Sequence, residues 1–526
     1  MGLAAAFDGV RRPPSALVAA AALPCLLVAV PVAAIIDDAL RAGPRQMVTL
    51  LLRPLVRELL ANTLLLTVSA VIVGTLVGTC AALLVERTNL PGRRLFSALM
   101  AAPLAVPAFV ASYAWVSLSP AFEGFAGALL VTASTYFPLA YLPVAASLRG
   151  LDPVLEETAR SLGETSFGVL RRVILPQLRP AMLGGGVLIA LNALMEFGAF
   201  ALMRFRTFTT EVYAAYQTGF GEGEAAALAL VLLVLCFACV GGEAALRRRQ
   251  SYARVGRGSR RPIAPYHLGA WRIPACAALS LVVMLGLGVP LGMISYWLTQ
   301  HGAAAITPAE VSPQAVLGAT MTTIGLGLGG AALTVALALP LAILSVRWPT
   351  GALAASLERG AWMAQGMPGI VIALALISAT VHALPILYQS APLLLLAYAV
   401  LFTPYALVAI RAALVQTERR LEEAGRSLGL GWFGVLRRIT LPLIAPGLGA
   451  AAALVFIAVT TELPATLLLA PIGTQTLAIR VWADTSTVAF AAAAPYAAIL
   501  VTLSLSASLV LARQFGLGLL RLDPER

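Results

Sequence analysis

Long apolar runs alternate with short polar segments along the whole chain. About twelve of these runs are roughly 20 or more residues long, enough to cross a bilayer as a helix. Prolines such as Pro103, Pro107 and Pro368 interrupt some runs, which membrane helices tolerate. The pattern therefore predicts an all-α integral membrane protein with about twelve transmembrane helices. The runs cover residues 15–36, 62–84, 95–119, 124–147, 181–203, 223–246, 273–297, 316–345, 353–380, 390–413, 447–470 and 487–512.

The composition also indicates that lipid is the solvent of this chain. Hydrophobic residues make up 60% of its 526 positions and charged residues only 11%, whereas a soluble domain is about one quarter charged. All five cysteines lie in or beside apolar runs, so we expect no disulfide framework. We interpret the CxxC formed by Cys236 and Cys239 as helix packing. The three histidines are scattered in loops, and we assign no residue to a firmly bound metal.

Arginine sets the predicted orientation, because every one of the 36 basic residues is an arginine. The most basic segment, residues 247–262, separates the sixth apolar run from the seventh. Cytoplasmic loops of membrane proteins are enriched in basic residues. We therefore place this segment and both termini in the cytoplasm. The first run follows Arg11 and Arg12 as in a signal peptide, but its length and the later runs predict an uncleaved first helix.

The chain contains the same motif twice. Leu155–Met182 and Leu421–Leu448 are identical at 16 of 28 aligned positions, with an offset of 266 residues (421 minus 155). The same offset pairs Thr210 with Thr476 further along. Self-similarity at a fixed offset is the signature of repeated structural units, so the sequence predicts two homologous halves.

Each predicted half contains six spans. The first half covers residues 1–246 and carries its copy of the motif in a loop at 151–180. A basic cytoplasmic linker follows at 247–272. The second half covers 273–526, with its loop at 417–446. Because each half has an even number of spans, the halves run in the same direction and form a parallel repeat.

The duplicated loop has the features of a docking surface. Glu156 and Glu157 stand near the start of a short predicted helix, where carboxylates suit the helix dipole. Gly163 follows where a helix end needs a left-handed residue. The next segment is amphipathic with Phe167 on its apolar side, and Pro176 is expected to mark a boundary before the next span. The loop either docks into a groove on a partner or lies on lipid headgroups, and its duplication favours a partner present twice.

The two copies resemble the EAA loop of binding-protein-dependent ABC importer permeases. In the family pattern, a Glu-Ala-Ala triplet precedes a glycine and then a Leu-Pro pair. Thr158 and Gly425 depart from this pattern by exchanges between small residues, which we expect not to disturb packing. The positions that carry the resemblance are Glu157, Thr158, Ala159, Gly163, Leu175 and Pro176 in the first copy, and Glu423, Ala424, Gly425, Gly429, Leu441 and Pro442 in the second.

In that family the loop is a coupling helix seated on an ATPase subunit. The resemblance therefore implies two copies of an ABC ATPase subunit, a periplasmic or lipid-anchored substrate-binding protein, and membrane lipid as partners, with no role for nucleic acid. It implies the bacterial cytoplasmic (inner) membrane as the location. The ATPase-coupling residues it implies are Glu156, Glu157, Arg160, Gly163, Pro176, Glu422, Glu423, Arg426, Gly429 and Pro442.

The absence of lysine excludes one activity for this chain. A P-loop needs a lysine that reaches the phosphates of ATP, and this sequence contains none. We therefore expect a translocation subunit that is not an enzyme, has no catalytic residues and holds no cofactor. ATP and Mg are expected on the partner ATPase.

Two further segments narrow the family. Met195–Phe220 and Thr461–Ser486 are similar to the corresponding segments of ferric-iron (Fe³⁺) importer permeases, which are commonly fused two-half chains. Thiamine and aminoalkylphosphonate permeases are close relatives and remain alternatives. In the same segments, Tyr213, Tyr216 and Trp482 are expected to belong to the interfacial aromatic belt.

Glu196 and Glu462 are the candidate residues of the substrate pathway. They are expected inside the fifth and eleventh spans, at equivalent places in the two halves. Carboxylates in a membrane usually face a water-filled path or a partner, and hard cations prefer oxygen ligands. Either the two carboxylates attract a cation weakly, or each caps a broken helix or pairs with an arginine such as Arg204 or Arg480.

Two other classes of protein are alternatives. A secondary transporter with two six-span halves needs ion-coupling groups in the membrane, and the duplicated docking loop and the scarcity of buried charges speak against it. A membrane-embedded enzyme needs a metal-spaced cluster or a nucleophile elbow, and the sequence contains neither.

Overall fold

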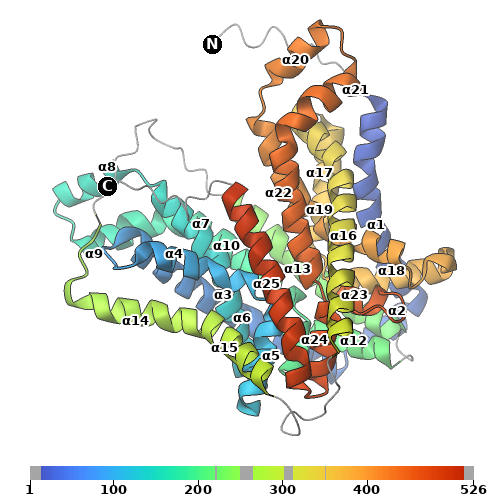
Figure 1. Ribbon diagram of the computed structural model, residues 1–526, viewed down its shortest axis with the longest axis horizontal. Helices are drawn as coiled ribbons and strands as arrows, with labels where there is room; N and C mark the ends of the chain where they lie inside the picture. The colour runs from blue at the N-terminus through green and yellow to red at the C-terminus, as the bar shows by residue number, and fades with distance from the viewer. Residues whose placement is uncertain (1–12, 219–221, 249–264, 301–311, 350, 515–526) are drawn as a thin grey trace.

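The computed structural model describes residues 13–218, 222–248, 265–300, 312–349 and 351–514 (Figure 1). The only β-structure among them is an isolated bridge between Thr88 and Tyr266. Ten helices are long and apolar enough to cross a membrane, and twelve spans result if each of two sharply bent helix pairs counts as one. The prediction of an all-α membrane protein with about twelve spans is therefore confirmed.

The described helices fall into the two predicted halves along the chain. Those of the first half are α1 (Ser15–Ala42), α2 (Pro44–Leu51), α3 (Pro54–Arg87), α4 (Arg93–Ala101), α5 (Ala108–Leu118), α6 (Phe125–Tyr136), α7 (Pro138–Arg149), α8 (Pro153–Ser161), α9 (Ser166–Val169), α10 (Leu175–Met195), α11 (Gly198–Leu202), α12 (Phe208–Gln217) and α13 (Glu222–Arg248). Those of the second half are α14 (Arg272–Val283), α15 (Val289–Thr299), α16 (Pro313–Arg347), α17 (Ala352–Trp362), α18 (Gly369–Ala383), α19 (Ala391–Gln416), α20 (Arg419–Ser427), α21 (Trp432–Val435), α22 (Leu441–Thr461), α23 (Pro464–Leu469), α24 (Leu477–Ser486) and α25 (Phe490–Gln514).

Each half is built around one long helix. In the first half α3 packs against α7 and α10, and in the second α16 packs against α19 and α22. Small residues permit these contacts: a Cβ atom at Gly78 would lie 2.7 Å from the backbone oxygen of Phe137, and one at Gly330 would lie 3.1 Å from Val459 Cγ2. Close backbone approach through glycine is the usual means of packing helices in lipid, where burial of apolar surface contributes little.

The third predicted span of each half is not a straight helix. The pair α4 and α5 bends by 91°, and the pair α17 and α18 bends by 109°. Val106 and Met367 are extended at the two bends, because a following proline excludes the residue before it from the helical region. The predicted spans at 95–119 and 353–380 are therefore broken at Pro107 and Pro368.

The fifth and eleventh spans begin earlier than predicted. Continuous helical stretches run from Ser166 to Met195 and from Trp432 to Thr461. In each, one π-helical turn directly precedes the proline that was expected to be a boundary. A proline inside a helix removes a hydrogen bond to the preceding turn, and a π-turn accommodates such a gap. Pro176 and Pro442 therefore lie within helices and do not end them.

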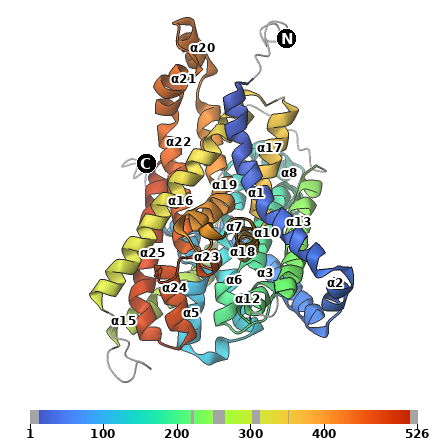
Figure 2. The same ribbon diagram turned by 90° about the vertical axis from the view of Figure 1, so that its right-hand side faces the viewer.

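The two halves are intertwined. The first helix of the chain, α1, packs against α16 and α18 of the second half, whereas α15 packs against α5 of the first half. Figures 1 and 2 both show α1 beside α16. Polar contacts join the same elements: Ser378 Oγ donates to Asp38 Oδ1 at 2.7 Å, and the Tyr113 hydroxyl donates to the Phe490 backbone oxygen at 2.9 Å.

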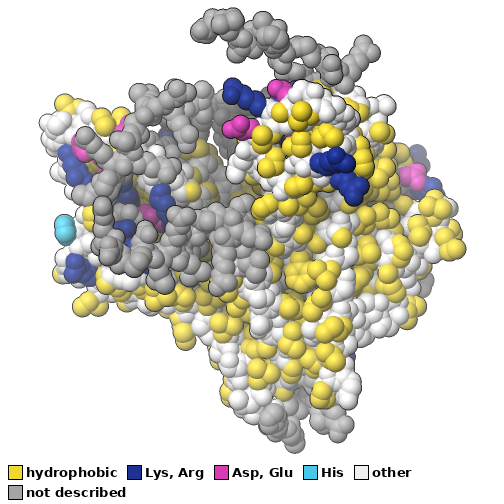
Figure 3. All heavy atoms as spheres, turned by 45° about the horizontal axis from the view of Figure 1, so that its top comes forward, with side chains coloured by type: hydrophobic (Ala, Val, Ile, Leu, Met, Phe, Trp, Pro, Cys, Tyr) yellow, Lys and Arg dark blue, Asp and Glu magenta, His cyan; other side chains and the backbone are white. Residues whose placement is uncertain are grey.

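Charged side chains gather around the two duplicated loops, although ion pairs such as Arg53–Glu224 and Arg206–Glu211 lie elsewhere. Figure 1 shows α20 and α21 at the upper right and α8 and α9 at the left, whereas α5, α12 and α24 lie at the bottom. In Figure 3 arginine and carboxylate side chains gather on the face turned toward the viewer, and hydrophobic side chains cover the flank below it. The apolar flank is the surface that suits lipid, and the charged face suits water or a partner.

Candidate functional site

The first duplicated loop folds as a helix–turn–helix. Asp152 Oδ1 accepts a hydrogen bond from the Val154 N–H at 3.0 Å and caps the start of α8. Gly163 has φ of 89°, and the next N–H, of Glu164, donates to the Ala159 oxygen at 3.0 Å. This is the left-handed helix end that the sequence predicted at Gly163.

The second loop repeats this geometry. Gly429 has φ of 87°, and the Leu430 N–H donates to the Gly425 oxygen at 3.1 Å. A Cβ atom at Gly425 would collide with the Ile439 side chain. The equivalent residues of the first loop are an alanine and the smaller valine, so the two loops exchange volume between facing positions. The small residue at Gly425 is thus accommodated because the larger Ile439 side chain occupies the space beside it.

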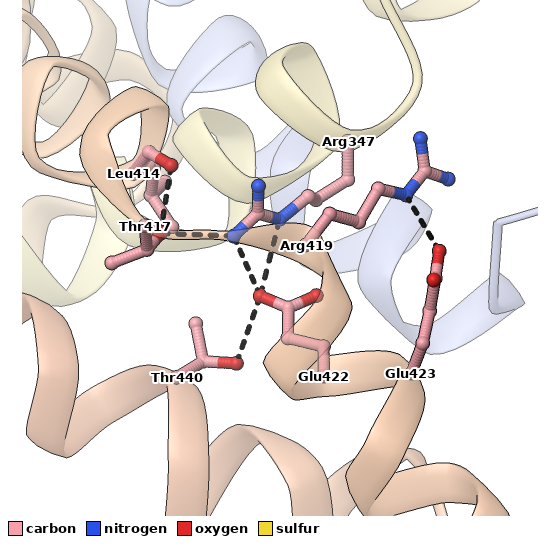
Figure 4. Close-up of polar contacts among 7 residues, drawn as sticks. All are labelled: Arg347, Leu414, Thr417, Arg419, Glu422, Glu423 and Thr440. Atoms are coloured by element: carbon pink, nitrogen blue, oxygen red, sulfur yellow. Dashed lines mark hydrogen bonds and ion pairs between the residues drawn. The ribbon is translucent and has the colours of Figure 1, made fainter. Parts of the chain in front are cut away.

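Both loops are anchored by a buried ion pair. Glu156 is only 4% exposed and pairs with Arg87, the last residue of α3. Glu422 is 7% exposed and pairs with Arg347, the last residue of α16. Arg347 donates to Glu422 Oε1 through Nη2 at 2.6 Å and through Nε at 3.1 Å (Figure 4). These two glutamates do stand in the first helical turn, as predicted, but their main partner is the arginine.

The two arginines were missed in the sequence. They lie 260 residues apart (347 minus 87), not the 266 that separates the loops, because the intervening bent spans differ in length. A signal was nevertheless present, since each arginine directly ends a long apolar run. The buried pairs hold α8 to the end of α3 and α20 to the end of α16.

Additional polar groups complete the pairs, and they differ between the halves. In the first half the Tyr266 hydroxyl donates to Glu156 Oε2 at 3.4 Å, and its ring lies 5.1 Å from the Arg160 guanidinium. In the second half Thr440 donates to Glu422 Oε1 at 3.2 Å, and Arg347 donates to Thr417 Oγ1 at 3.0 Å (Figure 4).

Apolar side chains project from both loops. Leu162 and Leu428 are 80% and 84% exposed, and Phe167 and Phe433 are 70% and 67% exposed. Their neighbours Glu157, Arg160, Glu423 and Arg426 are exposed as well. The loops thus carry matched apolar and charged faces, which suits the same partner surface twice or a lipid headgroup layer.

Glu196 and Glu462 lie at helix breaks and not inside the spans as predicted. Each follows the last residue of a spanning helix and is extended, with ψ of 126° and 124°. Their Oε1 atoms accept hydrogen bonds from the N–H groups of Ala199 and Ala465, each at 2.9 Å. The alternative that these glutamates cap a broken helix is therefore confirmed.

The alternative of an ion pair with an arginine is wrong for both glutamates. Arg204 pairs with Glu123 at 3.5 Å. Arg480 pairs with Asp484, four residues later on α24, at 3.3 Å. Burial raises the pKa of the Asp484 carboxyl above its usual value, and the Arg480 guanidinium partly opposes that shift.

The two helix breaks meet between the halves. A Cβ atom at Gly198, two residues after Glu196, would lie 2.7 Å from Leu463 Cδ2, which belongs to the residue after Glu462. Beside this contact, the Tyr213 and Trp482 rings lie edge to face with centroids 5.8 Å apart. These two aromatic residues join α12 to α24, and the assignment of Tyr213, Tyr216 and Trp482 to the interfacial aromatic belt stays a prediction.

The repeat register also differs from the prediction near these breaks. Thr207 and Thr476 precede α12 and α24. The N–H groups of the next residues, Phe208 and Leu477, donate to Thr63 and Thr323 respectively. Thr207 is therefore the equivalent of Thr476, and the predicted pairing of Thr210 with Thr476 is wrong by three residues. The second half has three more residues between its glutamate and this threonine.

Comparison with known proteins decides the family. The sequence profile of the family described as "Binding-protein-dependent transport system inner membrane component" matches residues 70–252 and again residues 313–514. The chain belongs to this family. It is thus a multi-pass ABC importer permease, a translocation subunit, and the resemblance seen in the duplicated loops is confirmed.

Individual relatives differ in how much of this permease they match. The chain is 38% identical to the Fe(3+)-transport system permease protein FbpB 2 of Haemophilus influenzae over 497 residues, which is 94% of this chain and 97% of that protein. The sulfate transport system permease protein CysT of Salmonella typhimurium is 31% identical over 33% of this chain and 69% of its own length. The molybdenum transport system permease protein ModB of Escherichia coli is 30% identical over 29% of this chain and 76% of its own length. The last two proteins therefore correspond to about one half of the permease.

Proposed function

We propose that this permease is the translocation subunit of an ATP-driven importer of ferric iron, delivered by a periplasmic or lipid-anchored binding protein. The observation that carries this proposal is the 38% identity to a Fe(3+)-transport system permease over 94% of the chain. The sulfate and molybdenum relatives match only about a third of it. Iron is therefore favoured over the cargoes of single-half relatives.

The energy source is a separate pair of ABC ATPase subunits, which bind ATP and Mg. Two features support this part of the proposal. The chain has no lysine for a P-loop, and its two loops present matched exposed faces. Both loops are then cytoplasmic, with both termini on the same side of the bacterial inner membrane. Glu157, Arg160, Gly163 and their counterparts Glu423, Arg426 and Gly429 contact the ATPase or shape the contact.

The contacts within each half provide a path for the motion. A force on α8 reaches α3 through the buried Glu156–Arg87 pair, and a force on α20 reaches α16 through Glu422–Arg347. The continuous stretch that follows each loop is 30 residues long, about 45 Å at helical rise. It ends at Glu196 or Glu462, beside the contact between the halves. Closure of the ATPases thus changes the relation of the two breaks and opens the passage alternately to each side.

Uptake of radiolabelled ferric iron by cells with and without this gene tests the cargo. Thiamine and an aminoalkylphosphonate serve as parallel cargoes in the same cells. Loss of iron uptake alone supports the proposal, whereas loss of another cargo with normal iron uptake contradicts the iron assignment.

A second arm tests the energy source. The partner ATPase carries an alanine in place of its P-loop lysine, which removes ATP hydrolysis without touching the permease. Iron uptake should then fall to the level of the gene deletion. Unchanged uptake would favour a secondary transporter.

A further inference from the structure

A small polar cavity lies inside the second half, next to the helix break at Glu462. It is small, with room for about one water molecule or one ion. Helices α16, α19 and α22 and the segments around α23 and α24 contribute its walls. The polar side chains that line it are Thr323, Tyr398, Thr460, Glu462, Thr466 and Thr476.

Most of the hydroxyl hydrogens in this cavity are already committed. Thr323, Thr460 and Thr466 each donate to a backbone carbonyl oxygen, at 2.8, 2.9 and 2.9 Å. The Tyr398 hydroxyl lies 2.8 Å from Thr466 Oγ1. Tyr398 is the donor in this bond, because the Thr466 hydroxyl already donates its hydrogen to the Glu462 backbone oxygen. A hydroxyl that donates its hydrogen still has lone pairs as acceptors, so these groups present mainly acceptors to the cavity.

The backbone donors nearby are committed as well. The Leu477 N–H donates to Thr323 Oγ1 at 2.9 Å, and the Ile479 N–H donates to Thr476 Oγ1 at 3.2 Å. The Ala465 N–H donates to Glu462 Oε1 at 2.9 Å. Glu462 Oε2 makes no hydrogen bond to another residue that the structure describes. The cavity therefore combines one carboxylate with neutral oxygen acceptors.

The first half has different residues at the equivalent places. Leu194 and Phe200, both buried, occupy the positions of Thr460 and Thr466. The Tyr136 hydroxyl donates to Glu196 Oε2 at 2.6 Å, so both carboxylate oxygens of Glu196 have a partner. The two glutamates are thus equivalent in the repeat but not in their surroundings.

We propose that the cavity at Glu462 is a weak binding site for a hard cation and that Glu196 is not part of such a site. Hard cations take carboxylate, hydroxyl and water oxygens as ligands. A single charge among neutral oxygens binds such an ion weakly, as release into the cytoplasm requires. The identity of the ion as the transported ferric iron rests on the proposed function above.

Terbium(III) is a suitable probe, because it is a hard trivalent cation whose luminescence is excited through a nearby tyrosine, here Tyr398. The experiment titrates Tb³⁺ into the purified full chain in detergent and measures the luminescence excited through tyrosine. Glu462→Gln should weaken saturable binding by about tenfold or more, since loss of supporting residues alone costs that much at metal sites. Glu196→Gln is the comparison variant and should change the binding constant much less than Glu462→Gln does.

A second variant keeps the test independent of the carboxylate. Thr460→Leu combined with Thr466→Phe gives the second half the side chains that the first half already has at these places. This variant should also lose Tb³⁺ binding, and size-exclusion chromatography checks that it remains folded. Equal Tb³⁺ binding by the original chain and Glu462→Gln, or equal weakening by Glu196→Gln, overturns the proposal.

Displacement and uptake separate the two proposals. Gallium(III), a redox-inert substitute for ferric iron, should displace Tb³⁺ from the original chain. If Tb³⁺ binding requires Glu462 while iron uptake does not depend on the gene, the cation site stands and the iron assignment falls. If iron uptake depends on the gene but Tb³⁺ binding is unchanged in Glu462→Gln, the importer proposal is supported and the cation-site proposal is contradicted.

Discussion

The two duplicated loops hold equivalent buried glutamates with different third partners. In the first half, Tyr266 reaches Glu156 from the segment that joins the halves, and backbone bonds hold that segment to the end of α3: the Tyr266 N–H donates to the Arg87 oxygen at 2.8 Å, and the Asn89 N–H donates to the Tyr266 oxygen at 3.1 Å. In the second half the additional partners are two threonines that flank the loop itself. Thr440 donates to Glu422, and Thr417 accepts a hydrogen bond from Arg347.

In the part of the second half that the structure describes, no segment is bonded to the end of α16 as the segment around Tyr266 is bonded to the end of α3. The residue equivalent to Asn89 is Pro349, which has no N–H to donate to an adjacent extended segment. A small cavity remains beside the second pair, with Glu422, Arg426 and Trp432 among its lining residues. Both halves therefore share the buried ion pair. In the first half its additional partner comes from the linker between the halves, whereas in the second half the additional partners come from residues next to the loop.

The largest effect is expected where the common element itself is broken. Arg347→Ala leaves the Glu422 carboxylate buried without its main partner, and so does Arg87→Ala for Glu156. Removing one member of a buried ion pair costs about 3–5 kcal/mol, so each variant should release its loop from the long helix. Thermal unfolding of the purified protein and ATPase stimulation in the assembled transporter both measure this loss.

Matched variants separate the ion pair from charge in general. Arg426→Ala and Arg160→Ala remove exposed arginines of the same loops and should change stability by much less. The double variant Arg347→Ala with Glu422→Ala should recover part of the loss, because no unpaired charge remains buried. A single variant as stable as the exposed controls contradicts the anchoring role of the pair.

The next effect concerns the left-handed glycines, which the two loops share. Gly429→Ala forces a residue with a Cβ atom into φ of 87°, which costs roughly 1–2 kcal/mol. Gly429→Pro should be more severe, because proline fixes φ near −65° and removes the N–H that donates to the Arg426 oxygen. Iron uptake should fall while membrane insertion persists, and Gly163 should respond in the same way.

Gly431 provides the control within the same loop. Its φ is −66°, and a Cβ atom there would meet no other atom within 4 Å. Gly431→Ala should therefore leave uptake unchanged. Normal uptake in a protein that carries proline at both 163 and 429 would falsify the assignment of these loops to coupling.

Sequence reasoning predicted much of this site because its signals were local. Gly163 and Gly429 follow a helical segment at a position where only a left-handed residue closes the turn, and the structure has both there. The exposed Phe167 was predicted from amphipathic spacing. The apolar runs predicted the existence and order of the ten spans, although the fifth and eleventh begin 15 residues earlier than predicted.

The remaining features depend on contacts between distant segments. Arg87 finds Glu156 across 69 residues, and Tyr266 finds it across 110, so no spacing rule connects them. The breaks at Glu196 and Glu462 were hidden because apolar residues continue beyond them, although a carboxylate that caps the next short helix ends the span. The packing of α1 against α16 and α18 of the second half could not be predicted either, because the apolar sequence of α1 does not indicate which helices it contacts.

A smaller effect is expected when the linker residue Tyr266 is changed, and this effect should appear in the first half alone. Tyr266→Ala removes the hydroxyl bond to Glu156 and the ring that lies over Arg160 but retains the backbone bonds. One hydrogen bond and one exposed cation–π contact contribute about 1–2 kcal/mol together. Hydrogen–deuterium exchange should accelerate in residues 156–163 and remain unchanged in 422–429. Equal acceleration in both loops would show that the linker supports both duplicated loops and not the first alone.

The smallest effect tests whether the two supports are independent. Thr440→Ile gives the second loop the residue that the first has as Ile174 and removes only the 3.2 Å hydrogen bond to Glu422. Because Arg347 still holds that carboxylate, the loss should be about 0.5–1 kcal/mol, measured as faster exchange in 422–429. Combined with Tyr266→Phe, the two losses should add, since distant sites without shared partners behave additively. Non-additive losses would mean that the ion pairs of the two halves are energetically coupled, and α1, which packs across both halves, would be the first element to vary.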